Sequence, residues 1–304
     1  MRSWIARVAL IPLMLWVVAT LGFFLLRAVP GGPFDRERAS ASREVEAALK
    51  ARYHWDEPLW RQYLRYLGNV ARGDLGPSLK YRNHSVNDLL GQTVPVSLSL
   101  GAMAFGVAMG LGIPIGAITA LGRYRWADRA ASLLTLVGVC IPVFVLGPFL
   151  ILVAGLWLEW LPVALWGHSN HAVLPTLTLG LYFAARVSRW MREGMQEVLK
   201  SPHVQAARAK GLSETVVVVR HALPVALLPV ISYAGPMLAD LLTGSFVVEN
   251  LFQIPGTGAF FINSFFSRDY TMMIGMILFY SLLLQVLNLG SDLLLRWVDP
   301  RIRA

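Results

Sequence analysis

The side chains that could do chemistry are few in this chain, and their positions limit what that chemistry is. A hydrolase that works inside a membrane needs a nucleophile and a base at membrane depth, yet all six histidines fall in loops or at the edges of apolar stretches. No G-x-x-x-x-G-K-[ST] phosphate loop occurs in the sequence, so the chain lacks that route to binding ATP. We therefore predict no catalytic residue, no metal site and no cofactor on this chain.

One acidic residue, Asp240, interrupts a strongly apolar stretch and is followed by the hydroxyl residues Thr243 and Ser245. A charge at the centre of a bilayer costs about 2.5–3.5 kcal/mol on insertion scales, so such a residue faces a bundle interior or a water-filled cavity. Two interpretations stay open. Asp240, with Thr243 and Ser245, could line a substrate path and attract a cationic group. Alternatively, Asp240 could pair with an arginine or a hydroxyl group of a neighbouring helix or subunit.

A second polar feature lies near the two-thirds point of the chain and predicts two short helices. Ser201-Pro202 favours a helix start, because serine can cap and proline tolerates the first turn. Gly211 supplies the backbone freedom that ends this helix after about two turns. A second helix would open at Ser213-Glu214 and continue through Leu223-Pro224 into the next apolar stretch.

The side chains of the first of these helices suit a docking surface. Ala206 and Ala207 leave one face without bulk, so the groove of a partner could close over the backbone. Arg208 and Lys210 add charge beside that face. An ordinary helix in a cytoplasmic loop is the alternative interpretation.

The composition shows what surrounds these features. Hydrophobic residues make up 56% of the chain and charged residues 15%, with a mean hydropathy of +0.55, whereas charged residues approach a quarter of a soluble domain. The chain is therefore predicted to be an integral membrane protein. Its net charge of +9 comes from Lys and Arg concentrated at the ends and in alternate connections, which is a topology signal and argues against nucleic-acid binding.

Six apolar stretches approach the roughly 20 residues that a helix needs to cross the bilayer. We predict an all-α membrane protein with six transmembrane helices and both termini in the cytoplasm. The predicted spans are Ala9–Leu26, Pro95–Leu121, Ala130–Leu158, Ala172–Trp190, Ala222–Val247 and Thr271–Leu295.

These spans divide the chain into the N-terminus and first helix (1–26), a long external loop (27–94) and a transmembrane core (95–304). The core contains a cytoplasmic loop, 193–221, between helices 4 and 5. In the external loop, Glu44 to Val70 carries apolar residues at helical spacing, interrupted near Trp55 to Pro58, which predicts two short amphipathic helices. They could receive a partner or form a cap packed on the spans.

The segment Gln205 to Pro224 resembles the loop of ATP-binding-cassette importer permeases, whose pattern is E-A-A, three residues, G, nine residues, then I-x-L-P. This chain keeps both alanines, both spacings, Gly211, Leu223 and Pro224, and it differs at Gln205 and His221. Other motifs resemble the B-type permease subunit of oligopeptide and dipeptide importers, the oligopeptide branch above all. They are Pro30–Phe34, Gly73–Ser78, Ala207–Leu212, Arg220–Leu223, Val248-Glu249, Pro255–Gly258, Arg268–Tyr270 and Asp299–Arg303.

The resemblance implies partners that supply what this chain lacks. They are a second six-helix permease of the C type, two cytoplasmic ATPase subunits that hold ATP and Mg, and an external peptide-binding protein. Val204 to Leu212 would be a coupling helix in an ATPase groove, and Pro255, Gly256 and Gly258 would lie near an external gate. The chain would be a transport subunit and not an enzyme. It would move oligopeptides by alternating access across the cytoplasmic (inner) membrane of a prokaryote.

A single-component secondary transporter or channel is the alternative from another class. In that case Asp240 would be an ion site. Such a carrier usually has more spans or an internal repeat, and neither is evident in this sequence.

Overall fold

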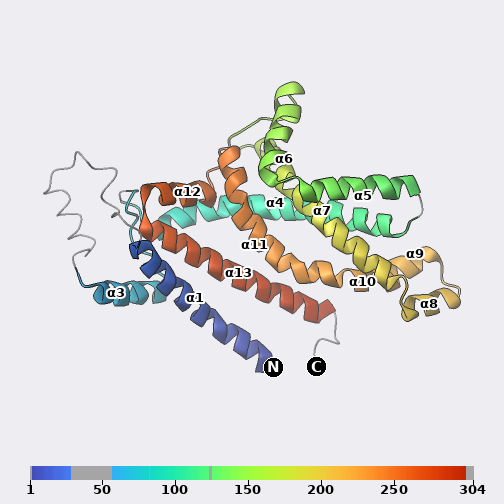
Figure 1. Ribbon diagram of the computed structural model, residues 1–304, viewed down its shortest axis with the longest axis horizontal. Coiled ribbons are helices and arrows are strands. Elements are labelled where there is room, and N and C mark those ends of the chain that lie inside the picture. Colours follow the sequence, from blue (N-terminus) through green and yellow to red (C-terminus); the bar gives the residue numbers. More distant parts are fainter. Residues whose placement is uncertain (1, 29–56, 82, 123–124, 299–304) are drawn as a thin grey trace. The chain divides into compact units, whose positions relative to one another are not determined.

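The computed structural model describes residues 2–28, 57–81, 83–122 and 125–298 (Figure 1). In these ranges the chain is helical, and pairing of extended backbone is limited to one antiparallel bridge between Pro77 and Ser85. The predicted all-α class is confirmed. The helices form two compact units, one of residues 1–95 and 256–285 and the other of residues 96–255 and 286–304.

Among the described helices, four are long and apolar enough to cross a membrane: Val8–Ala28, Val86–Ala120, Leu228–Leu251 and Tyr270–Trp297. They belong to α1 (Arg2–Ala28), α4 (Val86–Ala120), α11 (Leu228–Leu251) and α13 (Tyr270–Val298). These helices overlap the first, second, fifth and sixth predicted spans.

The third predicted span, Ala130–Leu158, is not one regular helix. It consists of α5 (Arg125–Cys140), α6 (Val143–Leu150) and a π-helical segment, η1 (Ile151–Trp157). Pro142 has extended backbone, with ψ of 148°, and it has no N–H group to donate the hydrogen bond that would continue α5. The apolar part after the break, Val143–Trp157, is shorter than the other four candidates.

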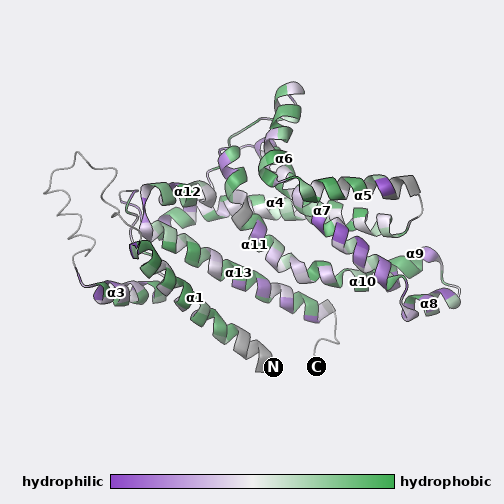
Figure 2. Ribbon diagram, in the orientation of Figure 1, coloured by the Kyte–Doolittle hydropathy of each residue, from purple (hydrophilic) through white to green (hydrophobic). Residues whose placement is uncertain are grey.

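The fourth predicted span, Ala172–Trp190, lies in η2 (Ser169–Ala172) and α7 (Val173–Val198), so the helix continues beyond the apolar stretch. Figure 2 shows α7 changing from mainly hydrophobic to mainly hydrophilic along its length. In the second unit α7 is the central helix, and it packs against α5, α6, α10 (Leu223–Ala226) and α11. Its buried side chains include Leu179, Val187 and Met191.

Two glycines allow α4 to approach α7 closely within this unit. A Cβ atom at Gly112 would lie 2.7 Å from the side chain of Val187, and one at Gly116 would lie 2.4 Å from the carbonyl oxygen of Ser188. Gly112 and Gly116 are four residues apart, so they lie on one face of α4 as in the small-xxx-small pattern of membrane helices.

In the first unit, α3 (Leu59–Ala71) packs on α1 through aromatic rings. The ring centroid of Phe23 lies 5.4 Å from that of Tyr63 and 5.5 Å from that of Tyr66, and Arg27 Nη2 donates to Gln62 Oε1 over 2.7 Å. This helix is the second of the two predicted amphipathic helices, and its packing is what the cap interpretation predicts. The first predicted helix lies in residues 44–55, outside the described residues.

Candidate functional site

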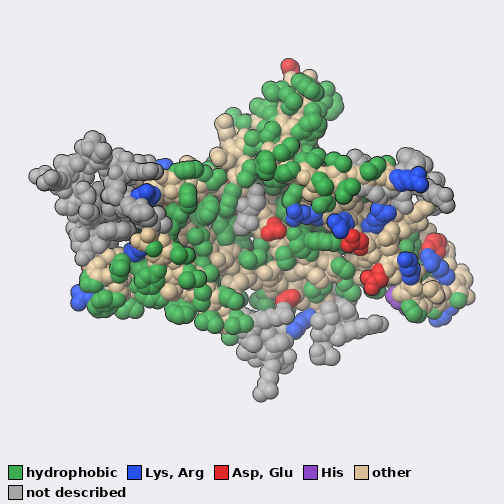
Figure 3. Space-filling view, in the orientation of Figure 1, with side chains coloured by type: hydrophobic (Ala, Val, Ile, Leu, Met, Phe, Trp, Pro, Cys, Tyr) green, Lys and Arg blue, Asp and Glu red, His purple; other side chains and the backbone are tan. Residues whose placement is uncertain are grey.

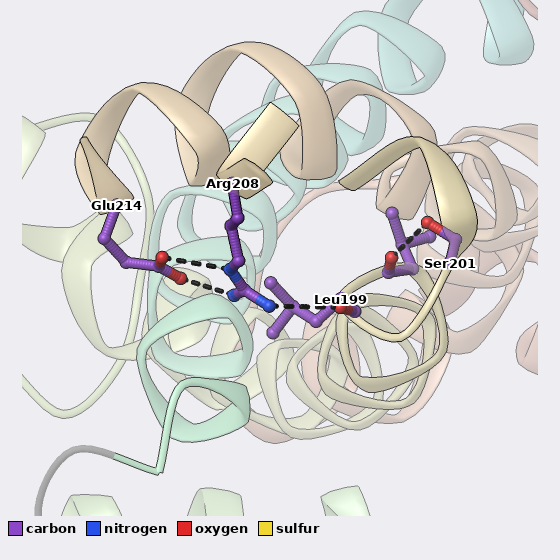
Figure 4. A network of polar contacts seen from close by, with 5 residues as sticks. Leu199, Ser201, Arg208 and Glu214 are labelled. Atoms are coloured by element: carbon purple, nitrogen blue, oxygen red, sulfur yellow. Dashed lines mark hydrogen bonds and ion pairs between the residues drawn. The ribbon is translucent and has the colours of Figure 1, made fainter. Parts of the chain in front are cut away.

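The predicted docking helix is α8, which spans Pro202–Ala209. Ser201 is its N-cap residue and Pro202 its first residue, as the sequence predicted, but the Ser201 hydroxyl makes no cap hydrogen bond to the helix. Ser201 Oγ instead donates to the carbonyl oxygen of Val198 at 2.5 Å, which ties the start of α8 to the end of α7 (Figure 4).

Gly211 ends α8 in the way its sequence position predicted. Its φ of +78° is in the left-handed region, where side chains with a Cβ atom are disfavoured. The Gly211 N–H donates to the carbonyl of Arg208 at 2.9 Å and the Leu212 N–H to that of Ala207 at 3.4 Å. These two bonds are the Schellman pattern, which satisfies carbonyl groups left open at a helix end.

The two alanines of α8 do not share a face. Ala207 is buried together with Val204, three residues before it, and these two side chains belong to the core of the second unit. Ala206 is exposed, as are Gln205, Arg208 and Lys210. The prediction of one bulk-free face with both alanines is therefore wrong, because helical spacing points residue 207 inward with residue 204. Leu212, just after the turn, is also exposed.

An ion pair joins the end of α8 to the second helix of the loop. Arg208 Nη2 lies 2.5 Å from Glu214 Oε1 and Nε lies 3.1 Å from Oε2, while Nη1 donates to the carbonyl of Leu199 at 3.4 Å (Figure 4). The hydrogen bond from Arg208 lowers the pKa of the Glu214 carboxyl below its ordinary value. Both side chains are largely exposed, at 41% and 59%, so the pair orients the loop more than it stabilises it.

The second helix runs toward α11 as predicted, but it is irregular. It comprises α9 (Glu214–Val216), a π-helical segment η3 (Val217–Ala222) and α10, and α11 starts after Leu227. Pro224 has no N–H group to donate to the carbonyl four residues earlier, and the wide π turn lies directly before it. Val204 and Ala207 of α8 pack in the same core as Val217 and Ala222 of η3.

Asp240 is exposed and contacts Tyr233, two turns earlier on α11. Tyr233 Oη donates to Asp240 Oδ2 over 3.2 Å, while Arg186 Nη2 on α7 donates to Tyr182 Oη. The pairing interpretation predicted a partner on a neighbouring helix or subunit, whereas Tyr233 belongs to the same helix as Asp240. The exposure of the carboxylate is what the path interpretation requires.

The structure does not bring Ser245 together with Asp240. Ser245 is fully buried, and its hydroxyl lies 2.7 Å from Glu249 Oε1 and 2.8 Å from the carbonyl oxygen of Leu242. The backbone of Thr243 lies in α11, and its side chain falls outside the described part of the chain.

The Pro255–Gly258 motif, expected near an external gate, lies at the start of a helix. Gly256 is the N-cap residue of α12 (Thr257–Ser267), so Gly258 already lies in the first turn of this helix. Thr257 Oγ1 lies 2.5 Å from Tyr280 Oη of α13, within the first unit.

Sequence reasoning missed two contacts that organise these regions. The edge-to-face contact of Trp190 on α7 with Tyr233 on α11, with ring centroids 3.8 Å apart, depends on which faces of the two helices meet, and no sequence signal marked it. The second contact joins Ser78 to Asp269 in the first unit, and the nearest signal was that each residue belongs to a recognised motif.

The architecture is that of a multi-pass, all-helical membrane protein with a polar two-helix segment between membrane helices. Residues 112–304 match the family described as "Binding-protein-dependent transport system inner membrane component". The chain belongs to this family and is thus an inner-membrane component of a binding-protein-dependent transport system.

Similar proteins cover nearly the whole chain. The oligopeptide transport system permease protein OppB of Haemophilus influenzae is 41% identical over 291 residues, which is 95% of each chain. OppB of Escherichia coli K12 is 40% identical over the same shares, and the dipeptide transport system permease protein DppB of Bacillus subtilis is 42% identical over 94% of this chain and 93% of its own. The resemblance to oligopeptide and dipeptide permeases is confirmed.

Solved structures support the fold. The chain matches the inward-facing MetNI methionine ABC transporter with a TM-score of 0.57 and 20% identity, over 69% of this chain and 96% of that chain. It matches an amino acid ABC transporter crystallised with histidines with a TM-score of 0.52 and 19% identity, over 71% of this chain and 94% of that one.

Proposed function

We propose that this chain is a permease subunit of an ATP-binding-cassette importer that moves oligopeptides across the cytoplasmic membrane by alternating access. ATP is hydrolysed on partner subunits. The observation that carries the proposal is the exposed polar helix α8, which is fixed at both ends between membrane helices α7 and α11. The names of the similar proteins support oligopeptides or dipeptides as the substrate class.

The residues proposed to couple this chain to the ATPase fall into an exposed set and a buried set. Gln205, Ala206, Arg208, Lys210 and Leu212 form the exposed set, which docks into a groove of an ATPase subunit. The buried Ala207 holds α8 against η3, and Gly211, Leu223 and Pro224 fix the path of the backbone into α11. A short helix braced in this way moves with the membrane helices, so closure of the ATPase pair changes the side to which the path opens.

The full complex contains this subunit, a second permease of the C type, two cytoplasmic ATPases that bind ATP and Mg, and an external peptide-binding protein. In this arrangement the chain has six membrane spans with both termini in the cytoplasm, the third span being the broken segment α5–α6–η1. Asp240 and Thr243 belong to the translocation path, the buried Ser245 packs behind it, and Pro255, Gly256 and Gly258 lie near the external gate. The charged Asp240 within a candidate span supports the first assignment.

Site-directed photocrosslinking tests the docking role. A photoreactive amino acid at exposed Ala206 should crosslink to an ATPase subunit in the assembled complex. The same probe at buried Val204, one half-turn away on α8, is the matched control and should not. Equal crosslinking from both positions, or crosslinking from neither, would contradict the assignment of α8 as the ATPase contact.

A further inference from the structure

Two side chains of opposite charge lie at the middle of two neighbouring helices of the second unit. Arg186 is midway along the 26 residues of α7, and Asp240 is midway along the 24 residues of α11. The two helices pack against each other. Asp240 lies near the middle of the candidate span Leu228–Leu251, where insertion of a charge is most costly, whereas Arg186 lies near the end of the predicted span Ala172–Trp190.

The side chains around these charges form a connected polar and aromatic cluster. Tyr233 Oη donates to Asp240 on α11, and Arg186 Nη2 donates to Tyr182 Oη one turn earlier on α7. The Arg186 guanidinium lies 4.5 Å from the ring centroid of Tyr182, and the rings of Trp190 and Tyr233 meet edge to face with centroids 3.8 Å apart. The cluster thus offers a carboxylate, a guanidinium, hydroxyl groups and aromatic faces.

The surface position of the cluster excludes contact with lipid. Asp240 is exposed and Arg186 partly exposed on the unit. Figure 3 shows basic and acidic side chains in a row along the course of α7, on a face that is otherwise largely hydrophobic. Charged groups at membrane depth face a water-filled cavity or another protein chain, since lipid cannot solvate them. This face of α7 and α11 therefore borders water or the second permease.

We propose that Arg186, Tyr233 and Asp240 form a charge-compensating site in the translocation path. Asp240 receives ammonium groups of a passing peptide, and Arg186 receives its carboxylate groups. The Tyr233 hydroxyl orients Asp240, and the Tyr182 hydroxyl orients Arg186. The proposal rests on the proposed function, and it adds the chemical groups of the cargo that this chain recognises.

A site with both signs of charge fits a zwitterionic cargo. A peptide that leaves water loses hydration of its charged groups, and charge-assisted hydrogen bonds from fixed partners offset that loss. The aromatic rings beside the charges offer contact area to any peptide side chain. Their faces additionally attract cationic groups. Such a site accepts many sequences and discriminates by charge.

Uptake by the assembled complex in proteoliposomes tests the proposal. Peptides of one length with net charge +1 or −1 are presented on saturated binding protein, and the ratio of cationic to anionic initial uptake is measured. Asp240→Asn should lower this ratio about tenfold, and Arg186→Gln should raise it by a similar factor. Arg189→Gln is the matched control, because Arg189 lies on the same helix in an exposed ion pair with Glu193 and should leave the ratio unchanged.

An unchanged ratio in Asp240→Asn and Arg186→Gln, with or without a loss of total uptake, would overturn the proposal. Should either variant fail to insert, cysteine labelling on a Cys140→Ser background provides the second measurement. Asp240→Cys should react with a membrane-impermeant thiol reagent, and bound peptide should protect it. Leu241→Cys, at a buried position, should not react. Absence of reaction at Asp240→Cys would also overturn the proposal. Failure of the wild-type complex to take up peptide with ATP would instead refute the proposed function.

Discussion

Ser78 donates a hydrogen bond to the carboxylate of Asp269, although 191 positions of sequence separate the two residues. Both are buried, and Asp269 also accepts from the backbone N–H of Lys80 at 3.2 Å and of Met272 at 3.1 Å. The carboxylate thus fastens the turn after α3 to the first turn of α13 within the first unit. This contact gives a physical reason why both residues belong to motifs shared with the permeases.

Removing the Ser78 hydroxyl should destabilise this unit. Ser78→Ala leaves one lone pair of a buried carboxylate without its donor, at a cost of about 1–3 kcal/mol. The expected result is a lower midpoint of thermal unfolding for the purified protein in detergent. Ser267→Ala is the control, because that hydroxyl is exposed and bonds only within its own helix end. Equal midpoints for the two variants would show that the contact contributes nothing.

Gly211 should tolerate asparagine but not valine. A Cβ atom there meets nothing within 4 Å, so the restriction comes from its φ of +78° and not from space. Asparagine adopts left-handed backbone with little strain, whereas a β-branched residue does not. Gly211→Val should abolish peptide uptake while the protein still inserts, and Gly211→Asn should retain most of it. Wild-type coupling of ATP hydrolysis to uptake in Gly211→Val would count against α8 as the coupling helix.

The Arg208–Glu214 pair should be insensitive to pH above about 4.5, the ordinary pKa of Glu214. Because Arg208 lowers the folded-state pKa, the contribution of the pair is complete above the ordinary value and is lost as pH falls through the lowered value. Titration of a ¹³C-labelled Glu214 carboxyl should give a midpoint below 4.5, and Arg208→Gln should return it to the ordinary range. A midpoint that Arg208→Gln does not move would show that the pair is absent in solution.

Replacement by alanine should have different effects on stability at two glycines of α4. A Cβ atom at Gly116 would lie 2.4 Å from a backbone oxygen of α7, so Gly116→Ala should force the helices apart and cost about 1–3 kcal/mol. A Cβ atom at Gly110 meets nothing within 4 Å, so Gly110→Ala should be neutral or slightly stabilising through its higher helix propensity. Thermal unfolding of both variants measures the difference, and similar midpoints would argue against the close approach of α4 and α7.

The sequence was most informative where local rules decide the structure. The limits of α8 followed from Ser201-Pro202 and Gly211, since capping and left-handed backbone depend on neighbouring residues. The apolar stretches of α1, α4, α11 and α13 followed from length and hydropathy. Short-range chemistry was sufficient in each case.

Local rules were insufficient where the structure depends on residues far apart in the sequence or on which helix faces meet. The burial of Ala207 depends on η3 packing beneath α8, and the Ser78–Asp269 bond depends on two segments meeting in the folded unit. The break at Pro142 was visible as a proline, but hydropathy alone joined both sides into one span. The contact between Trp190 and Tyr233 depends on the relative rotation of α7 and α11, which a single sequence does not encode in a readable pattern.

The most direct test of the central claim is peptide accumulation by this chain reconstituted with the second permease, the ATPase subunits and the binding protein. Radiolabelled oligopeptide inside proteoliposomes and phosphate release are measured together. An ATP-driven importer predicts accumulation that requires ATP hydrolysis, the binding protein and every subunit. Accumulation by this chain alone, driven by an ion gradient without ATP, would contradict it.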